Sequence, residues 1–274
     1  TKENQLVFLL PGPPRELIPM FEESVLPYLS SSLSGTFYSK TVKVCGLGES
    51  LAETMIGDLI EKQTNPTIAP YAKIGEVHFR VTASAKSEEE GKKLVEPILA
   101  EINKRFGDHV FTDKEEENLE DVVVDLLSKH KLTLVTAESC SGGLLSGKII
   151  NVPGVSKVFD EGFITYSNAA KQKYLGVKEE TLKKYGAVSK ETAKEMALGA
   201  IKNTGKQTAL AITGLAGPGG ARKDKPVGLV YIACAIEDKV FVKECHFSGH
   251  RQKIRENTVI YALNLLRMSL ISQF

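Results

Sequence analysis

Strand-type and helix-type runs alternate along residues 119–274, and this alternation constrains the fold more than any other feature of the chain. The strand-type runs lie at Leu132–Val135, Gly162–Tyr166, Thr208–Ile212, Gly228–Ile236 and Val240–Phe247. The helix-type runs lie at Leu119–His130, Leu144–Ile150, Asn168–Leu175, Glu179–Tyr185, Lys190–Asn203 and His250–Ser269. Only the turn at Glu237 and Asp238 separates the last two strands, which indicates an antiparallel hairpin beside strands joined through helices. The pattern predicts the α/β fold class, with a layered domain built on a mixed sheet.

Residues 36–112 predict a second, smaller domain. Strand-type runs at Phe37–Cys45, Glu76–Ala83 and His109–Phe111 accompany two amphipathic helical runs, Glu49–Lys62 and Glu88–Phe106. Two helices with about three strands are typical of a small α+β unit. The charged residues 113–118 follow, and we interpret them as a linker that acts as a solvated hinge.

The first 35 residues offer too little for a core of their own. An apolar strand is expected at Gln5–Leu10, a turn at Pro11–Pro14 and a helix at Arg15–Leu29. One strand and one helix cannot bury a core alone. This segment must therefore pack on the next domain or belong to a domain of which the rest lies elsewhere.

Composition excludes several classes of protein. The chain has 274 residues, enough for two domains, and a net charge of +1, so no strong field attracts nucleic acid or a membrane surface. No apolar run approaches the ~20 residues that a bilayer span needs, and the first residues are not a signal peptide. The four cysteines are widely separated and the five histidines have no zinc spacing, which predicts reduced thiols, a cytoplasmic location and no metal.

The segment Thr136–Gly143 carries the strongest chemical signal. It reads Thr-Ala-Glu-Ser-Cys-Ser-Gly-Gly and joins a strand-type run to a helix-type run. Hydroxyl and glycine residues at such a junction expose backbone N–H groups at the start of a helix, where a phosphate or an oxyanion can be held. Either Ser139 is a nucleophile, or the whole turn is an anion cradle.

Two other loops add to this signal. Lys171 is expected in the first turn of a helix that follows a strand, where burial and the helix dipole both favour the neutral amine. A neutral lysine could accept the proton of Ser139, as in serine–lysine enzymes. The glycine-rich loop Thr213–Gly220 also follows a strand, and ligands bind at the carboxyl ends of strands in open α/β sheets.

Simpler readings compete with these. A turn rich in serine and glycine can be only a turn, and a lysine is usually on the surface. Cys140 could replace Ser139 as nucleophile, although adjacent side chains on such a turn diverge. A serine–histidine arrangement with His246 or His250 also stays open.

Several separated motifs together resemble a known family. They are Thr136–Gly143, Gly162–Asn168 with Lys171, Gly186–Ser189, Thr213–Pro218, Lys225–Gly228, and Phe247–Gly249 with Arg251. In this order they are similar to the CinA C-terminal domain, the nicotinamide-nucleotide amidase family, over most of the chain from Leu119 onward. The family commonly has threonine where this chain has Ser141, a difference that keeps the hydroxyl.

The resemblance continues upstream and implies a domain order. Leu10–Pro14 with Glu16–Met20, Gly46–Glu49, Asn65–Thr67, and Ala69–Lys73 with Gly75 and Glu76 look like the full-length competence/damage-inducible CinA proteins. By this resemblance, residues 1–35 are the last strand and helix of a domain similar to molybdopterin-binding proteins. Residues 36–112 are a KH-like α+β domain, 113–118 the linker, and 119–274 the amidase domain.

The resemblance also implies an activity and a site. The reaction is hydrolysis of nicotinamide mononucleotide to nicotinate mononucleotide and ammonia, with no cofactor and no metal, by a cytoplasmic protein expected to be a homodimer. Ser139 is implied as the nucleophile, Lys171 as its base and Tyr166 as a residue that positions the pair. The residues implied in substrate binding are Ser141, Gly142, Gly143, Ser156, Thr213, Gly214, Gly217 and Arg251.

A regulatory protein that binds a nucleotide or nucleic acid without catalysis is the alternative. A KH domain clamps nucleic acid with a G-x-x-G loop. Residues 36–112 contain no such loop. Nucleic acid is therefore an unfavoured partner, and the middle domain is more simply a spacer or a dimer-building module.

Overall fold

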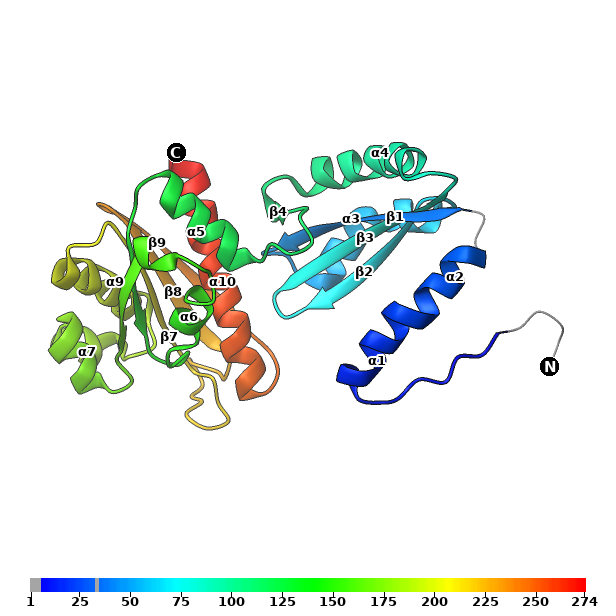
Figure 1. Cartoon of the computed structure of the whole chain (residues 1–274). Coiled ribbons are helices and arrows are strands. Elements are labelled where there is room, and N and C mark those ends of the chain that lie inside the picture. The colour runs from blue at the N-terminus through cyan, green and yellow to red at the C-terminus, as the bar shows by residue number, and fades with distance from the viewer. Residues whose placement is uncertain (1–5, 33–34) are drawn as a thin grey trace.

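The computed structural model describes residues 6–32 and 35–274, arranged as an N-terminal helical segment and two α/β domains (Figure 1). The KH-like domain contains β1 (Thr36–Cys45), α3 (Glu49–Glu61), β2 (Thr67–Lys73), β3 (Glu76–Ala85), α4 (Glu88–Phe106) and β4 (Val110–Thr112). Its antiparallel sheet has the order β2-β3-β1-β4. A core that includes Phe79, Ile56 and Phe106 lies between this sheet and the two helices.

Strand β2 is absent from the sequence-based expectation. Pro70 lies in the middle of the run, and a proline that cannot donate to a ladder argues against a central strand. In the structure β2 is an edge strand, paired only with β3. An edge strand tolerates proline because one side of its backbone has no partner in the sheet.

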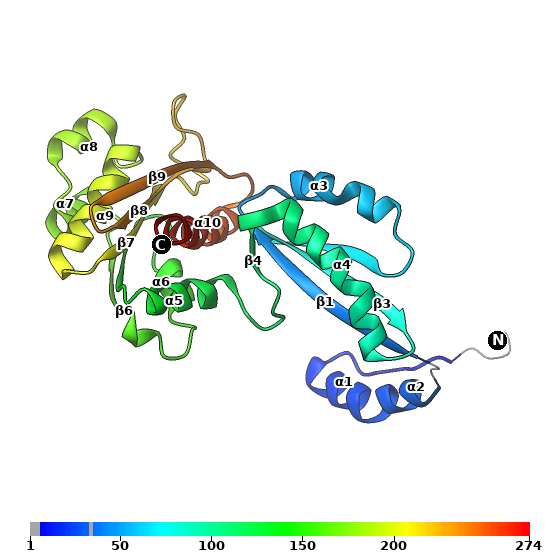
Figure 2. The same ribbon diagram turned by 90° about the horizontal axis from the view of Figure 1, so that it is seen from above.

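The second domain has three layers. Its sheet has the order β6-β5-β7-β8-β9, in which β6, β5 and β7 run parallel and β8 is antiparallel to both of its neighbours, β7 and β9. The strands are β5 (Leu134–Glu138), β6 (Phe159–Ile164), β7 (Thr208–Gly214), β8 (Leu229–Ile236) and β9 (Lys239–His246). The helices are α5 (Leu119–Lys129), α6 (Leu144–Ile149), α7 (Asn168–Leu175), α8 (Glu179–Tyr185), α9 (Lys190–Thr204) and α10 (Arg251–Gln273). Helix α9 covers one face of the sheet with α7, and α5, α6 and α10 cover the other (Figures 1 and 2). The predicted α/β class, mixed sheet and hairpin are confirmed.

Strand β5 begins and ends later than the sequence pattern indicates. The expected run was Leu132–Val135, whereas β5 continues through Thr136 and Glu138. Every residue of β5 is buried, because β5 lies inside the sheet and helices cover both faces. Polar residues at the end of an apolar run usually mark a loop, so only the neighbouring strands show that this segment is strand.

The N-terminal segment stands apart from both cores. It forms α1 (Pro14–Met20), a π-helical stretch (Phe21–Val25) and α2 (Leu26–Ser32), in agreement with the helix expected at Arg15–Leu29. Residues 6–10 form no strand, and Leu9 is 91% exposed, so the strand expected at 5–10 is wrong for the part that the structure describes. Gln5 lies outside the described residues. A lone extended segment has no backbone partner to make it a strand. No described residue of 6–32 enters the three hydrophobic cores.

Helix α10 joins the two domains. Figure 2 shows it between the sheet of the second domain and the KH-like domain. Arg267 of α10 is 2% exposed and donates hydrogen bonds to the backbone oxygens of Asp108 and Val110 in the KH-like domain. On the linker side, Lys43 of β1 donates to the carbonyls of Glu115 and Glu117 at 2.6 and 2.8 Å. The linker has exposed charges, as expected, but its backbone is hydrogen-bonded to Lys43 of β1.

Replacing Arg267 by methionine is expected to lower the free energy of unfolding by about 2 kcal/mol, because buried carbonyls lose a charged donor. Urea unfolding measures this change. Arg80→Met is the control, since Arg80 is exposed and a surface substitution changes stability by roughly 0.5 kcal/mol or less. Equal effects of the two substitutions would contradict a role for Arg267 in joining the domains.

Among residues 6–32 and 35–274, none of the helices combines the length and apolar character that a bilayer crossing requires.

Candidate active site

The ends of three parallel strands bring the predicted residues together. Ser139 follows β5, Lys171 lies in the first turns of α7 after β6, and Thr213 is near the end of β7. Two backbone bonds align these ends: the amide of Ser139 donates to Ile212 at 3.0 Å, and that of Thr165 to Glu138 at 2.8 Å. The carboxyl edge of the parallel part of the sheet is therefore the site, as expected for an open α/β sheet.

Ser139 and Lys171 form a direct pair. Lys171 Nζ donates to Ser139 Oγ at 2.9 Å, and the lysine is 1% exposed while the serine is 7% exposed. The ammonium is also held by the carbonyls of Thr165 and Tyr166, at 2.7 and 3.3 Å. Burial lowers the pKa of Lys171 from 10.5 to about 8, because desolvation disfavours the charged form. A neutral amine in contact with a serine hydroxyl can act as its base.

A cavity of about 250 Å³ opens onto this pair. Its lining includes seven of the predicted residues: Ser139, Tyr166, Lys171, Thr213, Gly214, Gly217 and Arg251. Gly217 has a φ of +74°, and a Cβ there would lie 2.7 Å from Val227, so this position requires glycine. Arg251 donates to the Gly217 carbonyl at 2.7 Å, which keeps a guanidinium at the rim of the cavity.

Glu138 is a buried carboxylate that sequence reasoning left without a role. It is fully buried and accepts from the amides of Gly143, Leu145 and Ser146 at 2.9, 3.1 and 2.8 Å. The hydroxyl of Ser146 donates to it as well, at 2.6 Å. The anion at the start of α6 is therefore the protein's own side chain. The feature of the sequence that could have indicated this role is the position of a carboxylate immediately before the Ser139 turn.

Replacing Glu138 by glutamine is expected to lower the free energy of unfolding by about 2–4 kcal/mol, because the new NH₂ group faces amide donors that then lack an acceptor. Chemical denaturation measures the loss. Glu161→Gln on β6 is the matched control, since Glu161 is exposed. A loss no larger than that of the control would show that the carboxylate charge does not hold the turn.

Four predicted substrate-binding residues lie outside the cavity. Ser141 is completely buried, Gly142 and Gly143 do not line the cavity, and the Gly143 amide is occupied by Glu138. The carboxylate of Glu138 therefore occupies amides that were expected to bind an external anion. Ser156 is exposed on a short 3-10 turn (Val155–Lys157) that precedes β6. Because β5 and β6 are parallel, that turn lies at the opposite end of the sheet from Ser139.

Tyr166 contacts the Ser139–Lys171 pair through its backbone and not through its phenol. Its backbone carbonyl accepts from Lys171, whereas its side chain is 65% exposed at the mouth of the cavity. A backbone group therefore positions the Ser139–Lys171 pair. The phenol can still contact a bound molecule.

Arg255 is a second residue that the sequence reading missed. It donates to the carbonyls of Cys140 and Ser141 at 3.1 and 2.7 Å, and so fixes the turn that carries Ser139. It lies four residues after Arg251 on α10, and residues at this spacing share a helix face. That spacing was the signal that could have found it.

The competing nucleophile and base are less suited to the chemistry. Cys140 is 5% exposed, and burial raises the pKa of its thiol to about 11, which disfavours the reactive thiolate. His246 contacts Glu244, and His250 accepts from the Lys253 amide at the start of α10. Neither histidine lines the cavity with Ser139. Within residues 6–32 and 35–274, no group of three or more His, Cys, Asp or Glu side chains is arranged to hold a metal ion.

The fold and site define an α/β protein with a buried serine–lysine pair at the carboxyl edge of its sheet. Residues 116–270 match the CinA C-terminal domain, and residues 39–112 match the damage-inducible protein CinA KH domain. The chain belongs to the CinA family, as the resemblance of its motifs indicated.

Relatives and solved structures agree with this membership. The chain is 52% identical over 98% of its length to a Clostridium botulinum protein provisionally named competence-damage inducible protein, and it covers 66% of that protein. It is also 52% identical over 98% of its length to a CinA-like protein of Dictyoglomus turgidum, of which it covers 65%. The chain thus spans just under two thirds of the length of these curated relatives.

Crystal structures show the same fold over about half of the chain. A competence/damage inducible protein from Agrobacterium tumefaciens is 42% identical with a TM-score of 0.54, over 56% of this chain and 93% of that one. A CinA superfamily protein from Klebsiella pneumoniae is 30% identical with a TM-score of 0.55, over 57% of this chain and 99% of that one.

Proposed function

We propose that the chain hydrolyses the carboxamide of nicotinamide mononucleotide, giving nicotinate mononucleotide and ammonia. The observation that supports this most is the contact of 2.9 Å between a buried, largely unsolvated lysine amine and the hydroxyl of Ser139. The choice of substrate rests on the resemblance to the nicotinamide-nucleotide amidase family. The cavity of about 250 Å³ is of a size to admit a ring and its amide while the rest of the nucleotide lies toward the rim.

The proposed reaction uses one proton carrier. Ser139 Oγ attacks the carboxamide carbon as Lys171 Nζ accepts the hydroxyl proton. When the C–N bond of the tetrahedral intermediate breaks, the Lys171 ammonium gives that proton to the leaving nitrogen, which departs as ammonia. Water then attacks the acyl ester with Lys171 again as base, and Lys171 returns that proton to Ser139 Oγ as the acid leaves; the acid gives its remaining proton to solvent and becomes the carboxylate.

Two backbone amides are candidates for the oxyanion hole. The amides of Cys140 and Ala216 belong to residues that line the cavity, and within the described part of the chain neither donates a hydrogen bond. The residue after a nucleophile often supplies such a donor. Donors of this kind stabilise the charge that develops on the carbonyl oxygen.

Arg251 is the candidate for the phosphate of the substrate. Its Nη1 is bonded to Gly217, and the other N–H groups of the guanidinium are available at the rim of the cavity. A planar guanidinium matches two phosphate oxygens. We also propose that the chain forms a homodimer. Light scattering measures the mass in solution, and the mass of a single chain would contradict the homodimer.

The proposed activity is tested by ammonia release from nicotinamide mononucleotide, with EDTA present throughout. Nicotinamide riboside serves as the comparison, since it keeps the amide but lacks the phosphate. We expect release from the mononucleotide and a markedly lower kcat/KM for the riboside. A folded chain that binds the mononucleotide without releasing ammonia would instead support a nucleotide-binding protein without catalysis.

A further inference from the structure

A second cavity, of about 630 Å³, lies between the two domains and shares no residue with the Ser139 cavity. The KH-like domain lines it through the end of β2, the following turn and the start of β3. The second domain lines it through Gly143–Asn151 around α6 and through Glu256, Val259 and Ile260 of α10. Asn118, at the end of the linker, completes the wall. A ligand here would touch both domains at once.

One part of this cavity is apolar. Its apolar lining consists of Ile74, Leu144, Val259 and Ile260. Ile74 is 43% exposed at the tip of the β2–β3 turn. A flat ring placed between Ile74 and α10 would cover this surface.

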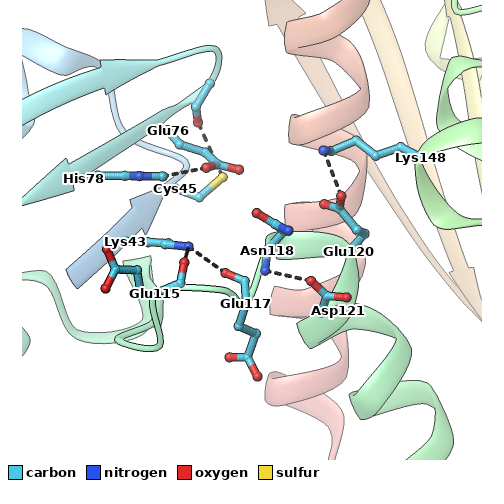
Figure 3. A network of polar contacts seen from close by, with 11 residues as sticks. Lys43, Cys45, Glu76, His78, Glu115, Glu117, Asn118, Glu120, Asp121 and Lys148 are labelled. Atoms are coloured by element: carbon cyan, nitrogen blue, oxygen red, sulfur yellow. Dashed lines mark hydrogen bonds and ion pairs between the residues drawn. The ribbon is translucent and has the colours of Figure 1, made fainter. Parts of the chain in front are cut away.

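Two lysines and a histidine line the same cavity from both domains. Lys73 and His78 come from the KH-like domain and Lys148 from α6. Figure 3 shows His78 and Lys148 on opposite sides of Asn118. His78 is bonded to Glu76 at 2.9 Å, whereas Lys73 has no carboxylate within ion-pair distance among the described residues. The two lysine ammonium groups, one from each domain, suit a phosphate.

Glu256 supplies an acceptor on the wall of the cavity, and Glu120 positions Lys148 beside it. Glu120 holds Lys148 through one oxygen at 3.0 Å, and its other oxygen is buried with no hydrogen-bond donor in the described part of the chain. Lys148 has three N–H donors, so this bond leaves others for a ligand. Glu256 lines the cavity, and one of its oxygens accepts a hydrogen bond from Gln252, which leaves the other oxygen for a ligand. Acceptors of this kind suit the hydroxyls of a sugar.

We propose that the interdomain cavity is a binding site for a nucleoside monophosphate, distinct from the Ser139 cavity. The base lies against Ile74 and α10, the ribose hydroxyls face Glu256, and the phosphate lies between Lys73 and Lys148. The binding site itself does not depend on the proposed amidase activity.

The position of the cavity connects it to the nucleophile turn. Gly143 lines the cavity, and its amide is bonded to Glu138, the residue before Ser139. Glu256 lines it too, and follows Arg255, which holds the Cys140 and Ser141 carbonyls. A bound nucleotide therefore contacts both segments that fix the Ser139 turn, and we expect it to change turnover.

Replacing each of three glycines by phenylalanine gives a matched test, because the new side chain occupies the space beside the glycine. A side chain at Gly147 enters the interdomain cavity, one at Gly219 enters the Ser139 cavity, and one at Gly57 on α3 enters neither. A Cβ at each of the three would meet no atom within 4 Å, and none has a positive φ. The variants Gly147→Phe, Gly219→Phe and Gly57→Phe are compared in the full chain, with thermal unfolding as the check on folding.

Binding of AMP is measured by calorimetry. We expect AMP to bind the wild-type chain, and Gly147→Phe to weaken that binding at least tenfold while the other two variants keep it. Lys73→Ala should weaken AMP binding roughly tenfold, as the loss of one charge-assisted contact does. Inorganic phosphate should bind at least tenfold more weakly than AMP.

Three results would overturn the proposal. They are absence of AMP binding at millimolar concentration, loss of binding in Gly219→Phe with retention in Gly147→Phe, and equal binding of AMP and inorganic phosphate. The effect on turnover rests on the proposed function and is measured separately. AMP should change kcat at least twofold in the wild-type chain and not in Gly147→Phe, and an unchanged kcat in the presence of bound AMP would remove the regulatory role.

Discussion

Replacing Ser139 by alanine is expected to reduce ammonia release from nicotinamide mononucleotide to below ~1% of the wild-type rate, because the covalent step loses its nucleophile. Ser139 is 7% exposed and its hydroxyl contacts Lys171, so alanine removes one oxygen and leaves the shape of the turn. Binding of the substrate should stay within a few-fold of wild type. Initial rates and equilibrium binding are measured on the same preparation.

Cys140→Ala is the matched control for this substitution. Cys140 is adjacent to Ser139, lines the same cavity and is equally buried, and its thiol has a pKa raised to about 11 by burial. We expect this variant to keep at least one third of the activity. Turnover that survives in Ser139→Ala and disappears in Cys140→Ala would assign the nucleophile to the thiol.

Replacing Lys171 by methionine is expected to cause a loss at least as large, because no other described base contacts Ser139 Oγ. Methionine keeps the length and the apolar stem in a site that is 1% exposed. Lys171→Arg separates two roles of the lysine: it keeps the positive charge but cannot accept a proton at neutral pH. Both variants should be inactive if Lys171 is the base, whereas activity in Lys171→Arg would indicate that only the charge matters.

The pH dependence of kcat/KM follows from the same residue. The amine must be neutral to accept the proton, and burial places the pKa of Lys171 at about 8. The rate should therefore rise about tenfold per pH unit below pH 8 and level off above it. A profile that is flat between pH 6 and pH 9 would contradict proton transfer to Lys171.

The order of the elements and the character of the Ser139 turn could be predicted from the sequence. Helices α7, α8 and α9 begin where expected, because their first residues follow capping residues such as Ser167 and Ser189. The strand-to-helix junction at Ser139 and the position of Lys171 at the start of α7 were also local properties, set by residues within a few positions along the chain. The reading of the residues already paired Ser139 with Lys171, and the family resemblance implied their roles as nucleophile and base.

Strand β2 and the end of β5 could not be predicted in this way. Pro70 in β2 is tolerated because the strand is at the edge of its sheet, and Glu138 in β5 is tolerated because three amides and one hydroxyl of α6 surround its carboxylate. Both conditions depend on neighbours in space. A rule that reads only the local pattern therefore assigns these segments to loops.

The sequence by itself determined most of the helices and strands, and which small polar residues stand at the strand ends. Only the tertiary structure decided which of them meet. Ser139 and Lys171 are 32 positions apart and come into contact because β5 and β6 are parallel neighbours, while the same arrangement places Ser156 at the far end of the sheet. Likewise Glu138 takes the amides that were expected to hold a substrate anion, and Arg255 reaches the turn from α10. Sheet order and helix packing fix these contacts, and they arise from the burial of the whole core, which no short stretch of sequence encodes.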